Sequence, residues 1–142
     1  MSTTGPYHRR CCTVKLLSPM GLLVLLGGCG QDSFAPEGLA EVYVDDFTSS
    51  ALQQCTTADL PLQHADAAEF FTRARVVHSK TLHDHYQLAP CQLEGTARYG
   101  EQRCNWQIQA GATGALQCGE QHWLFACDDC EALFAPTSDY SL

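Results

Sequence analysis

Positively charged residues are scarce in this 142-residue chain, which has 8 Lys and Arg against 16 Asp and Glu. Residues 29–142 hold all 16 acids but only 5 of the bases, a net charge of −11. Proteins that bind nucleic acid normally present a basic face, and docking to anionic lipid also needs basic residues. The composition therefore argues against nucleic acid as a partner and against electrostatic binding to a membrane. The length predicts one domain.

Motifs of several enzyme classes are also missing. The chain has no glycine-rich phosphate loop, no serine nucleophile motif and no HExxH zinc motif. The acid pairs Asp45-Asp46 and Asp128-Asp129 could serve acid–base chemistry or bind Ca²⁺, but adjacent residues of a strand point to opposite faces. We therefore interpret both pairs as surface acids. Since no nucleophile with a supporting base can be placed, we predict that the protein is not an enzyme.

A hydrophobic run long enough to span a bilayer is absent too. The apolar stretch 16–26 would form about 16 Å of helix, whereas the hydrocarbon core is about 30 Å thick. Arg9, Arg10 and Lys15 precede this stretch, and Pro19 interrupts it. A basic flank followed by a short apolar run is typical of a cleavable secretory signal peptide.

The apolar stretch ends in Leu26-Gly27-Gly28-Cys29, which resembles the lipobox of bacterial lipoproteins. The resemblance is confined to this segment. It implies that residues 1–28 are a signal peptide and that the Cys29 thiol carries lipid, palmitate included, which anchors the mature protein firmly in a membrane. It also implies, from Gly30 after the lipidated cysteine, export to the outer membrane with the protein facing the periplasm. A chance cysteine behind an ordinary secretory signal is the alternative.

The segment after the lipobox is polar and contains Pro and Gly. We predict that residues 29–40 are the lipidated N-terminus and a flexible tether, and that residues 41–142 form the envelope domain. Within this domain, Glu41–Val44 has the pattern of a short strand, and Thr48–Gln54 that of one or two helical turns.

A helix is predicted from about Ala67 to Val76. Asp66 stands at the expected N-cap and Glu69 follows three residues later, a pair similar to a capping box. Apolar residues then recur at i, i+4 and i+7 from Phe70, which gives the helix one apolar face. That face needs a sheet or a second helix against it.

The last third of the chain alternates between apolar and polar residues, which predicts strands with one buried face. Gly100-Glu101 and Gly119-Glu120 fit two-residue hairpin loops of type II′, and Gly111 can centre a third loop. The three turns give registers that place a single set of residues on the inner face, and a slip of one residue would break this agreement. The set is Leu93, Gly95, Ala97, Tyr99, Cys104, Trp106, Ile108, Gly114, Leu116, Cys118, Trp123, Phe125 and Cys127. We predict an α+β fold: a small single domain with an antiparallel four-stranded β-meander packed on one helix and stapled by disulfides.

Nine cysteines are many for a chain of this length. Cys11 and Cys12 leave with the signal peptide and Cys29 carries lipid, so six remain. An even number in an oxidising compartment favours disulfides. The predicted register places Cys104 opposite Cys118 on adjacent strands, close to bridging geometry. For the other candidates, a Cys55–Cys91 bridge or a bridge from the tail to the body is the simplest interpretation.

Redox exchange or metal binding is the alternative for the Cys127-x-x-Cys130 pair. The two Asp between the thiols would raise the thiol pKa and so slow redox attack. Zinc could be bound by Cys127, Cys130 and two further Cys or His ligands. A second possible group, for zinc or copper, contains His83 and His85, which share a face if this connector is extended. Solvated surface histidines are the simpler interpretation, and no cofactor is expected.

The polar face of the meander is broad and rich in amides. Its members are Gln92, Glu94, Thr96, Arg98, Arg103, Asn105, Gln107, Gln109, Thr113 and Gln117. His122 alternates onto the same side and is interpreted as plain surface. The face is either simply solvated or a protein-recognition surface, in which amides would supply hydrogen-bond specificity.

The leading functional hypothesis is a lipid-anchored, non-catalytic binding module of the bacterial envelope. It would act as an inhibitor, an immunity protein or an assembly factor on another envelope protein. Its acidic charge would speed encounter with a basic partner. The alternatives are a structural outer-membrane lipoprotein and a thiol-redox or metal-binding protein that uses Cys127 and Cys130.

Overall fold

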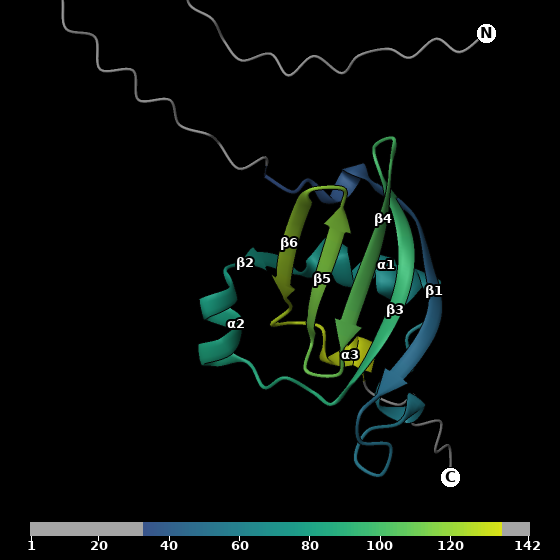
Figure 1. Cartoon of the computed structure of the whole chain (residues 1–142), viewed down its shortest axis with the longest axis vertical. Helices are drawn as coiled ribbons and strands as arrows, with labels where there is room; N and C mark the ends of the chain where they lie inside the picture. The colour runs from purple at the N-terminus through teal and green to yellow at the C-terminus, as the bar shows by residue number, and fades with distance from the viewer. Residues whose placement is uncertain (1–32, 135–142) are drawn as a thin grey trace, which may run out of the picture. The chain divides into compact units, whose positions relative to one another are not determined.

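The computed structural model describes residues 33–134 (Figure 1). The predicted signal peptide, the Cys29 lipidation site and the start of the predicted tether lie outside this range. No helix within residues 33–134 is long and apolar enough to cross a membrane. The elements in chain order are η1 (Pro36–Gly38), β1 (Leu39–Ser49), η2 (Thr57–Asp59), α1 (His64–Arg73), β2 (Arg75–Val77), α2 (Ser79–His85), β3 (Cys91–Tyr99), β4 (Gln102–Gln109), β5 (Thr113–Cys118), β6 (Gln121–Ala126) and α3 (Glu131–Phe134).

The six strands form one antiparallel sheet in the order β1-β3-β4-β5-β6-β2. Its four central strands are the predicted meander, and β1 and β2 each add an edge. Helix α1 lies behind the sheet in Figure 1 and covers its inner face. The α+β class is therefore confirmed, whereas the predicted four-stranded sheet is corrected to six strands.

The registers predicted for the meander are confirmed. Leu116 of β5 pairs with Trp106 on one side and with Trp123 on the other. Gly100 and Gly119 have φ angles of +60° and +59°, as a type II′ turn requires of its first central residue. These pairings follow from turn chemistry and alternation within about 30 consecutive residues, and both signals are local.

Strand β1 is longer than the predicted Glu41–Val44 strand: it has eleven residues, of which eight pair with residues of β3. The helical turns predicted for Thr48–Gln54 are confirmed only in part, as a single turn in which the Ala51 carbonyl accepts the N–H groups of Gln54 and Cys55 at 2.8 and 2.9 Å. Thr48 and Ser49 continue the strand because they pair with Gln92 and Cys91 of β3. A polar Thr-Ser-Ser sequence resembles a helix cap, and only the distant partner strand keeps it extended.

Residues 34–40, which were predicted to lie in the tether, belong to the folded domain. The Phe34 ring stacks on Tyr99 with 5.3 Å between centroids and meets the edge of Phe125 at 4.9 Å. The backbone N–H of Ala35 donates a hydrogen bond to the Tyr99 hydroxyl at 2.9 Å. One aromatic side chain in a polar segment thus anchors the start of the domain.

Helix α1 begins and ends three residues earlier than predicted. Asp66 is not the N-cap: it is the third helical residue, and its carboxylate accepts the N–H of the Gln63 N-cap at 2.8 Å. After Arg73 the backbone turns extended, and the two valines of β2 pair with β6. These β-branched residues fit a pleated strand better than a helix end.

The core lies between α1 and the inner face of the sheet. Phe70 and Phe71 are fully buried, and the Phe71 ring contacts the rings of Trp106 and Phe125 at 5.9 and 5.2 Å. The inward set predicted from the sequence is buried throughout, apart from the half-buried Tyr99. The predicted register therefore identified the core residues that the sheet contributes.

All six cysteines of residues 33–134 form disulfides. The pairs are Cys55–Cys91, Cys104–Cys118 and Cys127–Cys130. The first ties the loop after β1 to the start of β3. The second joins adjacent strands β4 and β5, as the register predicts. The third closes a short loop between β6 and α3.

Candidate binding surface

The outer face of the sheet, turned away from α1, faces the viewer in Figure 1, and none of the described helices crosses it. A shallow trough of about 400 Å³ crosses this face from β1 to β6. At a strand spacing of about 4.8 Å, four steps between strands make it about 19 Å long. This outer trough runs from Asp45 and Asp46 through Glu94 and Asn105 to Gln117 and His122.

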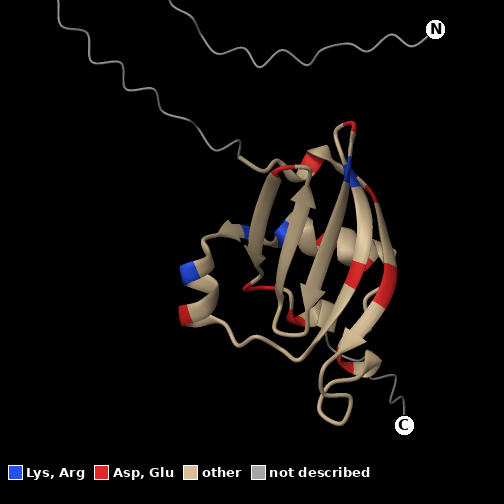
Figure 2. Cartoon of the chain, in the orientation of Figure 1, with Lys and Arg blue, Asp and Glu red and all other residues tan. Residues whose placement is uncertain are grey.

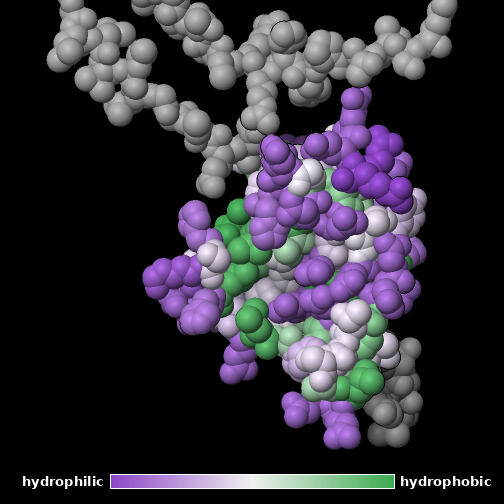
Figure 3. Space-filling model, viewed as in Figure 1, coloured by the Kyte–Doolittle hydropathy of each residue, from purple (hydrophilic) through white to green (hydrophobic). Residues whose placement is uncertain are grey.

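Two rows of cross-strand neighbours form the floor of the outer trough. The row here called the acidic row is Asp46, Glu94, Gln107 and Ala115. The amide row beside it is Thr96, Asn105, Gln117 and His122. Figure 3 shows hydrophilic side chains over much of this face, with hydrophobic patches at the left and in the lower part of the view. The outer trough is therefore anionic at its β1 end and neutral but rich in hydrogen-bonding groups along the rest.

A register shift in β1 brings two adjacent acids into the outer trough. The pairing of β1 with β3 shifts between Val44 and Asp46, and both Asp45 and Asp46 line the trough and are exposed. Strict alternation fails where a bulge inserts a residue, so both acids border the trough. Their exposure agrees with the interpretation of this pair as surface acids. Alternation alone gave no signal of this bulge.

The carboxylates at this end are oriented by hydrogen bonds but not neutralised. The Glu94 Oε1 atom accepts bonds from Gln92 Nε2 at 2.7 Å and from Thr48 Oγ1 at 3.4 Å. Within residues 33–134, the ion pairs of Lys and Arg involve other acids. The three acids of the outer trough therefore face solvent without a cationic partner in the part of the chain that the structure describes.

A basic pair lies on the same face, beyond the amide row. Arg98 of β3 pairs directly with Arg103 of β4, and both are exposed. Figure 2 shows this basic region near the β3–β4 hairpin and the acids of β1 and β3 further along the strands. The outer face thus carries two regions of opposite charge with amides between them.

Most of the polar face predicted from the sequence is found at the surface. Asn105, Gln107 and Gln117 are exposed, as is His122. Thr113 is the exception, with only 2% of its surface exposed, because it sits between β4 and β6 at the start of β5. Its hydroxyl donates a hydrogen bond to Gln109 Oε1 at 3.4 Å.

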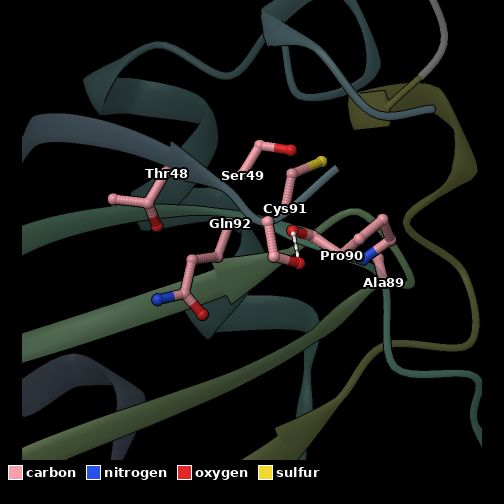
Figure 4. Close-up of a pocket in the computed structure, with 7 residues that line it drawn as sticks. Thr48, Ser49, Ala89, Pro90, Cys91 and Gln92 are labelled. Carbon is pink, nitrogen blue, oxygen red and sulfur yellow. Dashed lines mark hydrogen bonds between the residues drawn. The ribbon is translucent and has the colours of Figure 1, made fainter. Parts of the chain in front are cut away.

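A second hollow, of about 440 Å³, lies at the ends of β1 and β3 (Figure 4). Its polar groups bond to the protein itself. Ser49 Oγ donates to the Cys55 carbonyl at 3.0 Å, and Ser50 Oγ donates to the Pro90 carbonyl at 3.2 Å. Thr48 and Gln92, which also line this hollow, donate their side-chain hydrogen bonds to Glu94. This hollow therefore offers a ligand fewer free donors than the outer trough does.

The cysteine pair considered for redox or metal chemistry is joined by a disulfide. The sulfur atoms of Cys127 and Cys130 and a carboxylate oxygen of Asp129 lie within 4.8 Å of one another, so a reduced pair could offer three ligand atoms. The disulfide occupies both sulfurs, and Cys130 is fully buried. Zinc binding at this site would therefore require prior reduction of the disulfide.

The two histidines of the alternative metal group do not share a face. The connector is not extended at this point, because His83 and His85 are in α2. Two positions apart on a helix, side chains point in nearly opposite directions. Both histidines are exposed, and the structure does not bring them to Cys127 and Cys130 as one group of ligands.

A polar cluster not predicted from the sequence connects the end of α2 with the Cys127–Cys130 loop. Arg75 Nε donates to Asp128 Oδ2 at 2.9 Å, and Arg75 Nη2 donates to the Tyr86 hydroxyl at 2.9 Å. The Tyr86 hydroxyl in turn donates to Asp128 Oδ1. We call these three residues the edge latch, because they join β2 at the sheet edge to the residue after α2 and to the Cys127–Cys130 loop.

The edge latch predicts a pH-dependent contribution to stability. Its hydrogen bonds from Tyr86 and Arg75 lower the pKa of Asp128, and the bond to Asp128 raises the pKa of Tyr86. The Asp128 contribution is present above the unfolded pKa of Asp and is lost as pH falls through the lowered folded pKa. The Tyr86 contribution is present below the unfolded pKa of Tyr and is lost as pH rises through the raised folded pKa.

We therefore expect Tyr86→Phe to lower Tm slightly at neutral pH, by an amount that shrinks in strong acid and strong alkali. Thermal melts from acid to alkaline pH would measure this difference, and Tyr43→Phe, at an exposed tyrosine outside the latch, is the control. A difference in Tm between Tyr86→Phe and the parent chain that stays constant across the pH range would contradict the pH-dependent contribution of the edge latch to stability.

Comparisons with protein-family models, with curated proteins and with solved structures found no match to this chain. Any ligand of the outer trough must therefore be inferred from the side chains of the trough itself. These combine an uncompensated acidic end, a row of amides and a basic pair on one uncovered face.

Proposed function

We propose that this protein is a lipid-anchored binding module that recognises a partner protein in the cell envelope through the outer face of its sheet, without catalysing a reaction. The observation that carries the proposal is the contrast between the two faces of one sheet. Helix α1 covers the inner face, whereas the outer face is polar, hollowed and left uncovered by the described helices. Amide-rich surfaces of this kind provide directional hydrogen bonds to another chain.

The disulfides support a location outside the cytoplasm. Six cysteines in three bridges are typical of an oxidising compartment, and a domain this small gains stability from such crosslinks. They also fix the sheet that carries the outer trough, since the Cys55–Cys91 bridge lies at the start of β3. A surface held rigid before binding loses less conformational entropy in the complex.

The proposed anchor rests on the lipobox-like sequence at Cys29. Because the domain has structure from about residue 34 onward, only a few residues separate the lipid from the folded part. The binding module would therefore act close to the membrane surface, and its partner would be an envelope protein within reach of that surface.

Site-specific photo-crosslinking in the cells that produce the protein tests this function. A photoreactive phenylalanine analogue is placed at Gln107, in the middle of the outer trough, or at Thr72, on the exposed side of α1. We expect a discrete adduct with another protein from position 107 and none from position 72. The adduct should be recovered with the membrane, and in Cys29→Ser cells it should appear in the soluble fraction.

Adducts of equal yield from both positions would mean that the outer face is not a specific surface. The absence of any adduct from position 107 would contradict the binding function and favour a purely structural lipoprotein. An adduct that stays with the membrane in Cys29→Ser cells would contradict the lipid anchor while leaving the binding surface intact.

A further inference from the structure

We propose that the outer trough binds an extended, positively charged segment of the partner protein, with Lys or Arg side chains against the acids contributed by β1 and β3. This inference rests on the proposed function and adds to it the binding surface and the chemistry of the partner. A trough about 19 Å long accommodates about six residues in extended conformation. A loop or strand of the partner therefore matches its length.

A bound cation would relieve the most electrostatic repulsion at the β1 end of the outer trough. Asp46 and Glu94 are direct cross-strand neighbours, and like charges in that arrangement destabilise a sheet. The bulge adds Asp45 beside them. An ammonium or guanidinium group from a partner would replace this repulsion with charge-assisted hydrogen bonds. The free protein thus keeps an unfavourable arrangement that a basic partner relieves.

The rest of the outer face fixes the orientation of that segment. Asn105, Gln107 and Gln117 can both donate to and accept from main-chain groups of an extended chain. The Arg98–Arg103 pair stands four residues from Glu94 along β3, about 13 Å away. Arg98 forms an ion pair with Glu41 at 3.5 Å, which reduces the positive charge of the pair. The remaining positive charge repels a cation placed on that side, so the positive side chains are directed to the β1 end.

The overall charge favours a basic partner over a second copy of this chain. Residues 29–142 carry a net charge of −11, so two copies repel each other as they approach. A basic protein is attracted instead, which raises the association rate. The local acids and the net charge therefore point to the same class of partner.

The test uses the photo-crosslinker at Gln107 and compares two variants with the same change in charge. Asp46→Asn with Glu94→Gln neutralises the acidic row, whereas Glu101→Gln with Glu131→Gln neutralises two exposed acids outside the outer trough. We expect the yield of the adduct to fall at least fivefold in the first variant and to stay within twofold of the parent chain's yield in the second. Mass spectrometry of the adduct should place the crosslink beside two or more Lys or Arg residues.

A melting experiment separates lost binding from lost folding. Because Asp46→Asn with Glu94→Gln removes a repulsive pair, its Tm should equal or exceed that of the parent chain. A fall in adduct together with an unchanged or raised Tm supports the inference.

Other outcomes overturn the inference. An undiminished adduct in the Asp46→Asn, Glu94→Gln variant, or a crosslink to a neutral or acidic segment, would do so and leave the binding function standing. An adduct of twice the chain's mass would identify a second copy as the occupant. No adduct from the parent chain would overturn the inference and the proposed function together.

Discussion

Removal of the Cys55–Cys91 disulfide by Cys55→Ala with Cys91→Ala is expected to lower the free energy of unfolding by about 4 kcal/mol. The two cysteines are 36 residues apart and both are buried. The intervening chain includes α1, β2 and α2, so the bridge restricts a large part of the unfolded ensemble. Urea denaturation of the parent and the variant, with the unfolding slope compared as well, would measure the loss.

The Cys127–Cys130 bridge provides the matched comparison. Its cysteines are only three residues apart, and the same loop-entropy relation gives about 2 kcal/mol for Cys127→Ala with Cys130→Ala. Equal losses for the two variants would contradict the dependence on loop length. A larger loss at the short loop would show that the Cys127–Cys130 bridge stabilises by local packing around the buried Cys130 side chain.

The meander could be predicted from the sequence because its information is local. Two Gly-Glu turns and an uninterrupted alternation fix which residues face each other, and the Cys104–Cys118 pairing then follows from adjacent strands. A one-residue error at any turn would have placed glutamines and charged residues in the core. The aromatic residues and the small residues opposite them agreed on a single register.

The edges of the sheet depend on contacts between segments that are distant in sequence. Residues of β1 lie about 50 positions from their partners in β3, and β2 pairs with β6 across a similar separation. Local propensity assigned part of β1 to a helical turn and most of β2 to the end of the helix. Tertiary pairing overrides such preferences in short segments.

The candidate binding surface was predicted only in part for the same reason. Its amide row belongs to the meander and could be assigned to the polar face from alternation. Its acidic end needs β1 beside β3 and a bulge at which both Asp45 and Asp46 border the trough. Neither the partner strand nor the bulge had a local signal, so the two halves of the surface could not be joined from sequence.

Gly95→Ala is expected to lower the free energy of unfolding by about 3 kcal/mol, at the upper end of the range for overpacked cores. A Cβ atom at this position would lie 2.0 Å from the Tyr43 carbonyl oxygen and 2.3 Å from Trp106 Cζ2. The first obstacle is the backbone of β1. The second is a fully buried ring whose Nε1 donates to the Thr96 carbonyl at 3.0 Å. Neither can move without breaking a strand contact.

Gly100→Ala is the control that separates steric from conformational cost. Gly100 has a φ of +60° but no atom within 4 Å of its would-be Cβ, so only backbone strain, about 1 kcal/mol, opposes the change. Urea denaturation should rank Gly95→Ala well below Gly100→Ala in stability, and equal losses would contradict the steric argument. Because Gly95 lets β1 lie close to β3 next to the bulge, Gly95→Ala should also displace the trough acids and reduce crosslinking from position 107. The missing side chain in the core thus helps to shape the candidate binding surface on the other side of the sheet.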